Sequence, residues 1–251
     1  EDQLLLREMV AKFSDQELAP IAAELDRTGS FPTETVAGMA ELGLLGMVVP
    51  EEYGGAGMDF TSLAIAAEEI SRGCASHGVI LAVHNALMAW PLQLYGTEEQ
   101  KRLYLPRVCS GELLGAFALT ESEAGSDAAS LRTTAVDQGD HWVINGAKMW
   151  ITNSTAAKLF LVAAKTDPGA GHKGISLFLV EQGTPGFRVG RHEHLMGERA
   201  SGNAALSLED VAVPKENLLG ELGGGFKILM TLLDTSRIDI GAQAVGIAQA
   251  A

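Results

Sequence analysis

The sequence predicts an α+β protein of several domains: an all-helical domain over residues 1–114, an antiparallel β-domain over 115–214, and the beginning of a C-terminal helical domain over 215–251. Three observations support this division. Apolar residues recur at helical spacing up to about Leu114, short apolar runs separated by Gly, Pro and Asp follow, and helical spacing returns after Pro214. We expect the β-domain to be a small antiparallel β-barrel or a sandwich, because a series of short strands builds such folds.

Helix boundaries in the first domain are marked by capping and turn residues. Pro32 can open a helix in FPTETVAGMAELG and Gly43 can end it. Asp59 can cap the helix of FTSLAIAAEEISRG, and Thr97 with Gln100 has the spacing of a capping box, in which each side chain accepts from the backbone of the other. SHGVILAVHNALMAW is apolar on nearly every side, so we expect a buried helix there.

The middle of the chain is expected to contain hairpins. Asn145-Gly146 lies between WVI and AKMWIT, and this dipeptide favours a two-residue turn that needs positive φ. Further strand-like runs are LFLVAAK, GISLFLVEQG, FRVGRHEHLM and NAALSLEDVAV.

The last helical pattern follows the glycine-rich LGELGGGF and is still apolar on one face at Ala251. We expect this helix to be cut off, so that the isolated chain exposes an apolar face and associates.

Composition excludes several classes of protein. A formal net charge of -14 argues against nucleic acid as a partner, since phosphate binding needs a basic surface. No apolar run approaches the roughly 20 residues of a transmembrane segment, and EDQLLLREMVAKF does not read as a basic leader, so we expect a soluble globular protein. Cys74 and Cys109 are far apart and form no CxxC motif, which predicts two reduced, buried thiols in a reducing compartment.

Neither the glycine clusters nor the histidines predict a ligand site. EEYGGAG and LGELGGGF lack the GK[ST] ending of a P-loop and follow no parallel strand, so they are expected to be loops. His192 and His194 could share one face of a strand, but no third metal ligand lies nearby. No metal site is predicted.

Two other sets of charged or titratable residues are interpreted structurally. Glu68 and Arg72 have i,i+4 spacing and are expected to form a solvated ion pair. His77 and His84 lie in the apolar helix and are expected to be core or pocket-lining residues.

Two strand-like stretches, FALTESEAGSD (117–127) and KMWITNS (148–154), end in hydroxyl-bearing and small residues. Trp150 and Thr152 would point to one face, because strand side chains alternate. An aromatic plane beside a hydroxyl suits a flat polar heterocycle, with Trp150 covering the ring and Thr152 and Thr120 reaching its heteroatoms. A buried tryptophan with surface threonines is the alternative, which spacing does not exclude.

At these two stretches the sequence resembles the acyl-CoA dehydrogenase family of flavoenzymes. ELGLLGMVVPEEYGGAG, YGTEEQKRLYLPRVCSGE, TPGF, VPKENLLG and the DTSR helix are further matches in the family's order, so the resemblance covers essentially the whole chain. It implies an α-helical N-terminal domain, a middle β-barrel and a C-terminal helical bundle. FAD and the acyl thioester would bind where these meet, in a homotetramer.

The resemblance also implies roles for individual residues. Thr120 would lie near the flavin ring edge, Trp150 against the isoalloxazine, and Thr152 near flavin N5. Ser126, Asp234 and Arg237 would contact the acyl-CoA, and the guanidinium suits an anionic ligand. The full set of implied FAD-binding residues is Phe117, Ala118, Leu119, Thr120, Gly125, Ser126, Trp150, Ile151 and Thr152.

The activity implied is α,β-dehydrogenation of an acyl-CoA to the trans-2-enoyl-CoA, as in the β-oxidation of fatty acid metabolism. Electrons would pass to electron-transfer flavoprotein, in the bacterial cytoplasm or the mitochondrial matrix. GVILAVHNALMAWPLQLYG looks most like short-chain, butyryl-type members, and Met88 and Trp90 could shorten the acyl pocket. The alternatives are an acyl-CoA oxidase-like enzyme that uses oxygen and a non-catalytic module that binds FAD or acyl-CoA.

The sequence departs from the family at two places. Most members have a proline after the TE pair, whereas here Ser122 and Glu123 follow, which would loosen the turn. Some members have a catalytic glutamate before the arginine of the DTSR helix, where this chain has Ser236, and a hydroxyl is too weak an acid to replace a carboxylate. No catalytic base is therefore assigned within the chain, and we expect it in a further C-terminal segment.

Overall fold

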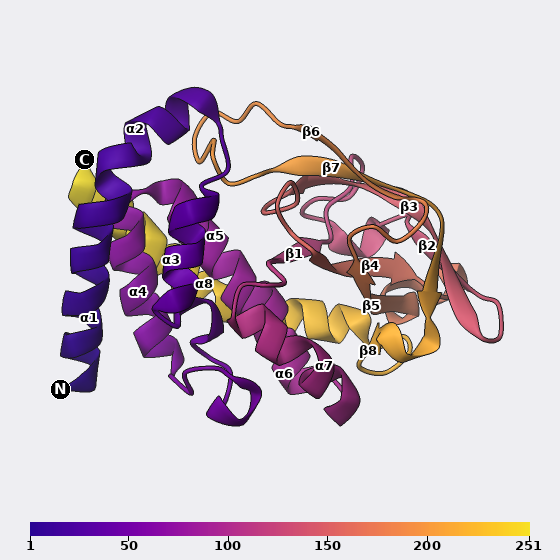
Figure 1. Cartoon of the computed structure of the whole chain (residues 1–251). Coiled ribbons are helices and arrows are strands. Elements are labelled where there is room, and N and C mark those ends of the chain that lie inside the picture. The colour runs from indigo at the N-terminus through magenta and orange to yellow at the C-terminus, as the bar shows by residue number, and fades with distance from the viewer.

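A computed structural model describes all residues, 1–251, and shows a helical half beside a sheet half (Figure 1). Two π-helical turns, Ser14–Leu18 and Asn85–Ala89, join helices end to end. No helix combines the length and the apolar character needed to cross a membrane. The helices of the first half are α1 (Asp2–Phe13), α2 (Ala19–Thr28), α3 (Thr33–Glu41), α4 (Phe60–Gly73), α5 (Ala75–His84), α6 (Trp90–Tyr95) and α7 (Glu98–Cys109).

The predicted helix caps are confirmed. Asp59 Oδ1 accepts from the backbone N–H of Ser62 at 2.8 Å, which satisfies an amide that the first turn of α4 leaves free. Thr97 and Gln100 form both hydrogen bonds of a capping box at the start of α7. Gly43 has φ 74°, a conformation that glycine adopts without strain, and it follows the end of α3.

The apolar helix α5 is buried, as predicted. His77 and His84 are fully buried, and burial lowers the pKa of each imidazole to about 4. His84 Nδ1 accepts from the backbone N–H of Gly115 at 3.0 Å, and its Nε2 bonds the Val108 carbonyl at 3.1 Å. A neutral imidazole therefore ties α5 to the residue that begins the sheet. Both cysteines are free and buried, as expected.

The sheet contains eight strands. Seven follow the order β6-β7-β3-β2-β4-β5-β8, and the eighth, β1, pairs with β4 outside this order. It is mixed and open, so the prediction of an antiparallel barrel was wrong on both counts. Strand β1 pairs in parallel with β4, from Gly115 opposite Leu159 to Ala118 opposite Val162. The strands are β1 (Gly115–Ala118), β2 (Thr134–Asp137), β3 (His141–Ile151), β4 (Leu159–Lys165), β5 (Ile175–Glu181), β6 (Phe187–His192), β7 (Ala204–Pro214) and β8 (Leu218–Leu219).

The parallel pairing has a simple cause. Strand β2 also runs parallel to β4, so residues 119–133 carry the backbone back to the end of the sheet from which β1 started, and the antiparallel pair β2–β3 returns it there for β4. Alternating apolar runs identify strands but carry no information on such a non-local partner. A parallel pair also fits the burial pattern, because the first six residues of β4 are all buried rather than alternating.

Asn145-Gly146 is a bulge inside β3 and not the predicted hairpin turn. The turn lies earlier, where Gly139 has φ 95° and the Gln138 N–H donates to the His141 carbonyl at 2.9 Å. The register with β7 shifts between Ile144 and Gly146. A Cβ at Gly146 would come within 2.4 Å of Thr133 Oγ1, so glycine serves a close approach of two backbone segments rather than a turn.

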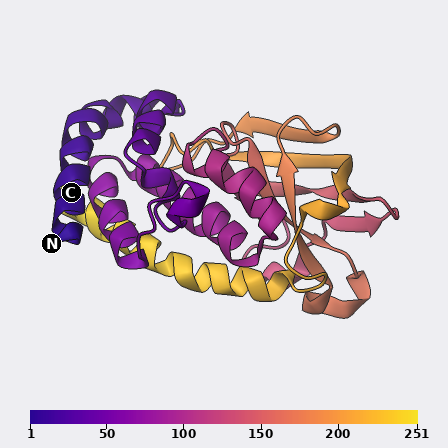
Figure 2. The same cartoon turned by 60° about the horizontal axis from the view of Figure 1, so that its bottom comes forward.

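The C-terminal helix α8 (Gly225–Ala250) runs from the sheet back along the helical half, so that both termini lie at the helical end of the molecule (Figures 1 and 2). Gln243 Nε2 donates to the Ala75 carbonyl of α5 at 3.1 Å, and a Cβ at Gly246 would lie 2.1 Å from the Glu68 carbonyl of α4. Ile238, Ile240 and Val245 on the opposite side are about half exposed, as expected. Association through this face stays a prediction.

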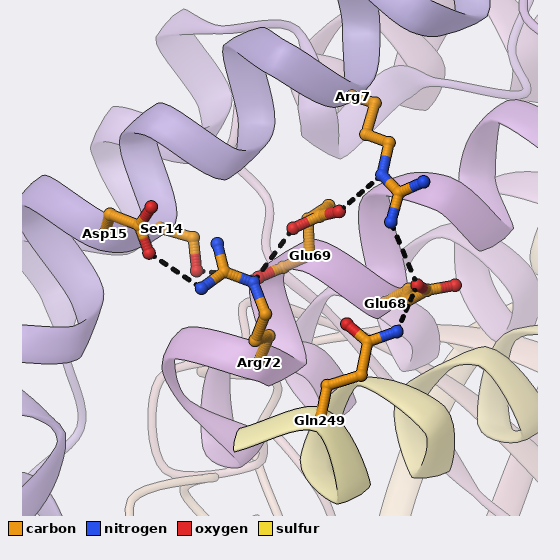
Figure 3. Close-up of polar contacts among 7 residues, drawn as sticks. All are labelled: Arg7, Ser14, Asp15, Glu68, Glu69, Arg72 and Gln249. Carbon is orange, nitrogen blue, oxygen red and sulfur yellow. Dashed lines mark hydrogen bonds and ion pairs between the residues drawn. The ribbon is translucent and has the colours of Figure 1, made fainter.

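A charged network joins α1, α4 and α8 (Figure 3). Glu69, which is only 4% exposed, accepts from Arg7 Nε at 2.7 Å and from Arg72 Nε at 3.0 Å. Arg72 also pairs with Asp15 at 2.8 Å, whereas Glu68 contacts Arg7 and Gln249 instead. The predicted Glu68–Arg72 pair was therefore wrong, because spacing along one helix cannot show which carboxylate the neighbouring helices bring within reach.

Candidate cofactor-binding site

The first candidate stretch begins at the end of β1. Ala118 and Leu119 have buried side chains, so only their backbone can reach a ligand, while Thr120 is half-buried. The loop then closes on itself, since Glu121 and Ala124 exchange two backbone hydrogen bonds of 3.0 and 3.2 Å. Ser122 and Glu123 occupy the exposed tip, so this turn forms without the expected proline.

The outer side of this loop is open. Gly125 and Ser126 are exposed, and a Cβ built on Gly125 would meet no atom within 4 Å. The N–H groups of Thr120, Ser126 and, from the second stretch, Thr152 donate no backbone hydrogen bond. Because backbone donors are rarely left without a partner, these groups are available to the acceptors of a ligand.

The second stretch is strained where β3 ends. Trp150 has φ 60° and is 51% exposed, and Asn153 has φ 68° and is fully buried. A large side chain in this region of φ costs about 1–3 kcal/mol and is found mostly at functional sites. The exposure of Trp150 contradicts the alternative of a buried tryptophan. The register shift between Lys148 and Ile151 also breaks the regular alternation from which a shared face for Trp150 and Thr152 was predicted.

Ile151 and Phe117 contribute less side-chain surface than Trp150. Ile151 is 2% exposed within the sheet core, so a ligand would meet its backbone only. Phe117 is half-buried against the cluster that joins β4, β5, α6 and α8.

Direct contacts bring the two stretches together. The Met149 N–H donates to the Thr120 carbonyl at 2.9 Å, and Lys148 Nζ donates to the Leu119 carbonyl at 3.1 Å and to Glu121 Oε1 at 2.8 Å. Lys148 is fully buried, and burial lowers its pKa to about 8 against the opposing charge of Glu121. Burial also acts to raise the pKa of Glu121, but the nearby ammonium and hydrogen bonds outweigh it and hold that pKa below its usual value.

Thr152 has a neighbour that sequence reasoning missed. Asn203, the residue before β7, donates from Nδ2 to Thr152 Oγ1 at 3.4 Å, and its Oδ1 is buried without a partner. Asn153 likewise bonds the Gly115 carbonyl at 3.0 Å and leaves its Oδ1 unpaired. Lys148 and Glu121 were also missed, although one lysine and one glutamate beside otherwise apolar strand residues are a usable signal.

The expected acyl-CoA residues Asp234 and Arg237 lie on α8. Asp234 and Arg237 have side chains that are 80% and 76% exposed, and they pair with each other at 3.6 Å. Arg237 lines a surface hollow with Leu233, Ser236 and Ile240, and Ser236 is 8% exposed. The ionisable side chains form no group of three or more that could hold a metal ion.

Comparison with known proteins gives a consistent result. Residues 1–112 match the family "Acyl-CoA dehydrogenase, N-terminal domain" and residues 116–211 match "Acyl-CoA dehydrogenase, middle domain". The short-chain specific acyl-CoA dehydrogenase of Rattus norvegicus mitochondria is 51% identical over 250 residues, which are 100% of this chain and 61% of the rat protein. The chain therefore spans about three fifths of the length of that relative.

Three solved structures share the fold. Butyryl-CoA dehydrogenase from Megasphaera elsdenii has a TM-score of 0.96 and 40% identity over 99% of this chain and 66% of its own. A chain of the structure described as "Electron transferring flavoprotein of Acidaminococcus fermentans: Towards a mechanism of flavin-based electron bifurcation" has a TM-score of 0.97 and 45% identity. The match covers 100% of this chain and 66% of that one. An acyl-CoA dehydrogenase from Bacillus anthracis complexed with FAD has a TM-score of 0.90 and 39% identity, over 98% and 42%.

The chain thus belongs to the acyl-CoA dehydrogenase family, whose members are FAD-dependent oxidoreductases that act on a CH–CH bond. The residues at the site fit this cofactor. Open N–H groups at Thr120, Ser126 and Thr152, an exposed Trp150 in a strained conformation, and empty space beside Gly125 suit a flat ring with a phosphate-bearing tail.

Proposed function

We propose that this chain is the FAD- and acyl-CoA-binding part of an enzyme that dehydrogenates a short-chain acyl-CoA to the trans-2-enoyl-CoA. One observation carries the proposal. Two stretches separated in sequence meet through Met149, Thr120, Lys148 and Glu121, and they present the half-exposed, strained Trp150 beside open backbone donors. The short-chain names of the similar proteins support the choice of substrate.

The residues of the two stretches would hold the cofactor in complementary ways. Trp150 offers an exposed aromatic face for the isoalloxazine, while Thr120 and Thr152 offer hydroxyl and N–H groups to its edge. Gly125 and Ser126 present backbone at the open side of the loop. Phe117, Ala118, Leu119 and Ile151 contribute backbone and packing. When bound, FAD supplies the acceptor for the hydride that leaves the β carbon.

The substrate would meet Ser126 and the two exposed residues of α8. Arg237 has a free guanidinium surface that suits a phosphate or a thioester oxygen, and its partner Asp234 is too exposed to neutralise it strongly. The α proton would be removed by a carboxylate outside this chain. Ser236 cannot perform this step, because a neutral hydroxyl is a poor base at neutral pH.

The wider assignments rest on the family and on the domain pattern. We propose a division into residues 1–114, 115–214 and 215–251, a homotetramer for the complete protein, and bacterial cytoplasm or mitochondrial matrix as its location. Electron-transfer flavoprotein is the proposed electron acceptor, which the Acidaminococcus fermentans structure supports. An oxidase that passes electrons to oxygen is the alternative, and release of peroxide under air would favour it.

A flavin titration tests the proposal. Purified protein is mixed with FAD, and the bound flavin is titrated anaerobically with butyryl-CoA while the visible spectrum is recorded. We expect FAD to bind, with Thr152→Val raising its dissociation constant and Thr155→Val, an exposed threonine three residues away, leaving it unchanged. Bleaching by butyryl-CoA in protein that carries its base supports the dehydrogenase. Absence of FAD binding contradicts the whole assignment, and bound FAD that no acyl-CoA reduces favours a non-catalytic module.

A further inference from the structure

A fully buried lysine stands where the two candidate stretches meet. Lys148 on β3 makes two hydrogen bonds, both to the 117–126 loop: one to Glu121 and one to the Leu119 carbonyl. An isolated ammonium would be too costly to bury, so its position depends on these acceptors. The ion pair thus fixes where β3 lies relative to the loop.

Glu121 is held from a third direction. Its carboxylate accepts from the N–H groups of Arg132 at 2.6 Å and Thr133 at 3.0 Å, and from Thr133 Oγ1 at 2.6 Å. With Lys148 it has four donors, which is about what a carboxylate can accept. Residues 132–133, which lead into β2, therefore hold the Glu121 carboxylate in position, and that carboxylate holds the Lys148 ammonium in position.

The lysine also acts on the donor at the end of β1. The Leu119 carbonyl and the Thr120 N–H belong to one conjugated peptide unit, so an ammonium on the oxygen polarises the N–H. That N–H has no backbone acceptor, and the Thr120 carbonyl is fixed by Met149, the residue before Trp150. The arrangement gives a strengthened donor with a fixed direction beside the strained tryptophan.

We propose that Lys148 and Glu121 are positioning residues for the flavin: their ion pair holds the 117–126 loop against Trp150, and the lysine charge strengthens the Thr120 N–H as a donor to the bound ring. This inference rests on the proposed function, because it requires FAD at this site. The two residues act through Leu119, Thr120 and Trp150 rather than by touching the cofactor.

The charge gives the proposal a signature that a merely structural pair would not show. Lys148 has its pKa at about 8, and Glu121 is the ionisable side chain that acts on it, while Leu206 faces it from β7 without charge. Above about pH 8 the lysine becomes neutral and the Thr120 N–H loses its polarising partner. Arginine at the same position stays charged.

The test measures the dissociation constant of FAD and the midpoint potential of the bound flavin from pH 6.5 to 9. Lys148→Met and Glu121→Gln should each weaken FAD binding tenfold or more, and Lys148→Met should lower the potential, because reduced flavin carries more negative charge. Lys148→Arg should bind FAD within threefold of the wild type and lose the change in potential near pH 8. Lys215→Met, which removes a partly exposed lysine paired with Asp137, is the matched control and should change neither quantity.

Loss of FAD binding by the wild type and loss of the Lys148 effect alone give different results. Wild-type protein that does not bind FAD removes the proposed function itself. Wild-type binding together with unchanged affinity, potential and pH profile in folded Lys148→Met and Glu121→Gln overturns this inference alone. If Lys148→Met does not fold by circular dichroism, Lys148→Arg decides the matter, since retention of the wild-type pH profile in that variant overturns the inference.

Discussion

The carboxyl group of Asp239 should make the stability of this protein depend on pH. Asp239 is fully buried on α8, one turn before Gln243, and neither of its carboxyl oxygens has a hydrogen-bond partner. Burial raises its pKa from the usual 3.8 to about 7. Above pH 3.8 the folded state keeps a proton that the unfolded chain releases. This difference lowers the free energy of unfolding by about 1.4 kcal/mol per pH unit, and so by about 4 kcal/mol at pH 7 and above.

Proton binding by Asp239 sets the direction in which stability changes with pH. Between pH 3.8 and about 7 the folded state holds more protons than the unfolded state, so this group makes stability fall as pH rises and has no further effect at higher pH. Asp239→Asn keeps the size of the side chain and removes the titration. Its free energy of unfolding relative to the wild type should therefore rise by about 2–3 kcal/mol between pH 5 and pH 7.5.

Urea unfolding followed by circular dichroism at several pH values measures this difference. Asp234→Asn on the same helix is the matched control, because its side chain is 80% exposed. Parallel pH profiles for Asp239→Asn and the wild type would show that the carboxyl is hydrated or paired in solution and would refute the reasoning.

The charged network around Glu69, the bulge in β3 and Trp150 at the candidate site should each respond to a single substitution. Glu69→Gln should lower the free energy of unfolding by about 1–3 kcal/mol in urea unfolding, because Glu69 is buried between two arginines, whereas Glu24→Gln in an exposed pair should change it by less than about 1 kcal/mol. Gly146→Ala should lower the free energy of unfolding by more than about 1 kcal/mol, because the new methyl group would meet Thr133. Gly241→Ala, which has open space around it in α8, should raise the free energy of unfolding by up to about 1 kcal/mol. Equal unfolding curves for the two variants would contradict both predictions. Trp150→Gly should raise the melting temperature by relieving the positive φ and weaken FAD binding, and tighter FAD binding would argue against a role for the indole.

Local chemistry in the sequence was enough to place most helices. The caps at Asp59 and Thr97 and the stop at Gly43 depend on atoms within four residues, and such interactions are the same in any fold. The buried histidines followed from the apolar character of their helix in the same way. Their pattern needed no knowledge of the partner helices.

Strand pairing and the details of the candidate site could not be read in this way. Nothing local to Gly115 indicates that it lies beside Leu159. Gly146 is required because Thr133 packs too closely for a Cβ, and not because of a turn. The two candidate stretches were singled out by their residues and by a family resemblance, but neither indicated the ion pair between Lys148 and Glu121 or the positive φ of Trp150. Strain and burial are properties of the assembled sheet.

The path of α8 has a consequence for synthesis of the chain. This helix covers α4 and α5, yet more than a hundred residues, including the whole sheet, separate it from the end of α7. At typical rates of translation the covering helix emerges on the order of ten seconds after the surface that it protects. During that interval the ribosome-bound chain presents a bare apolar surface, so the nascent protein is a natural client for chaperones at this stage.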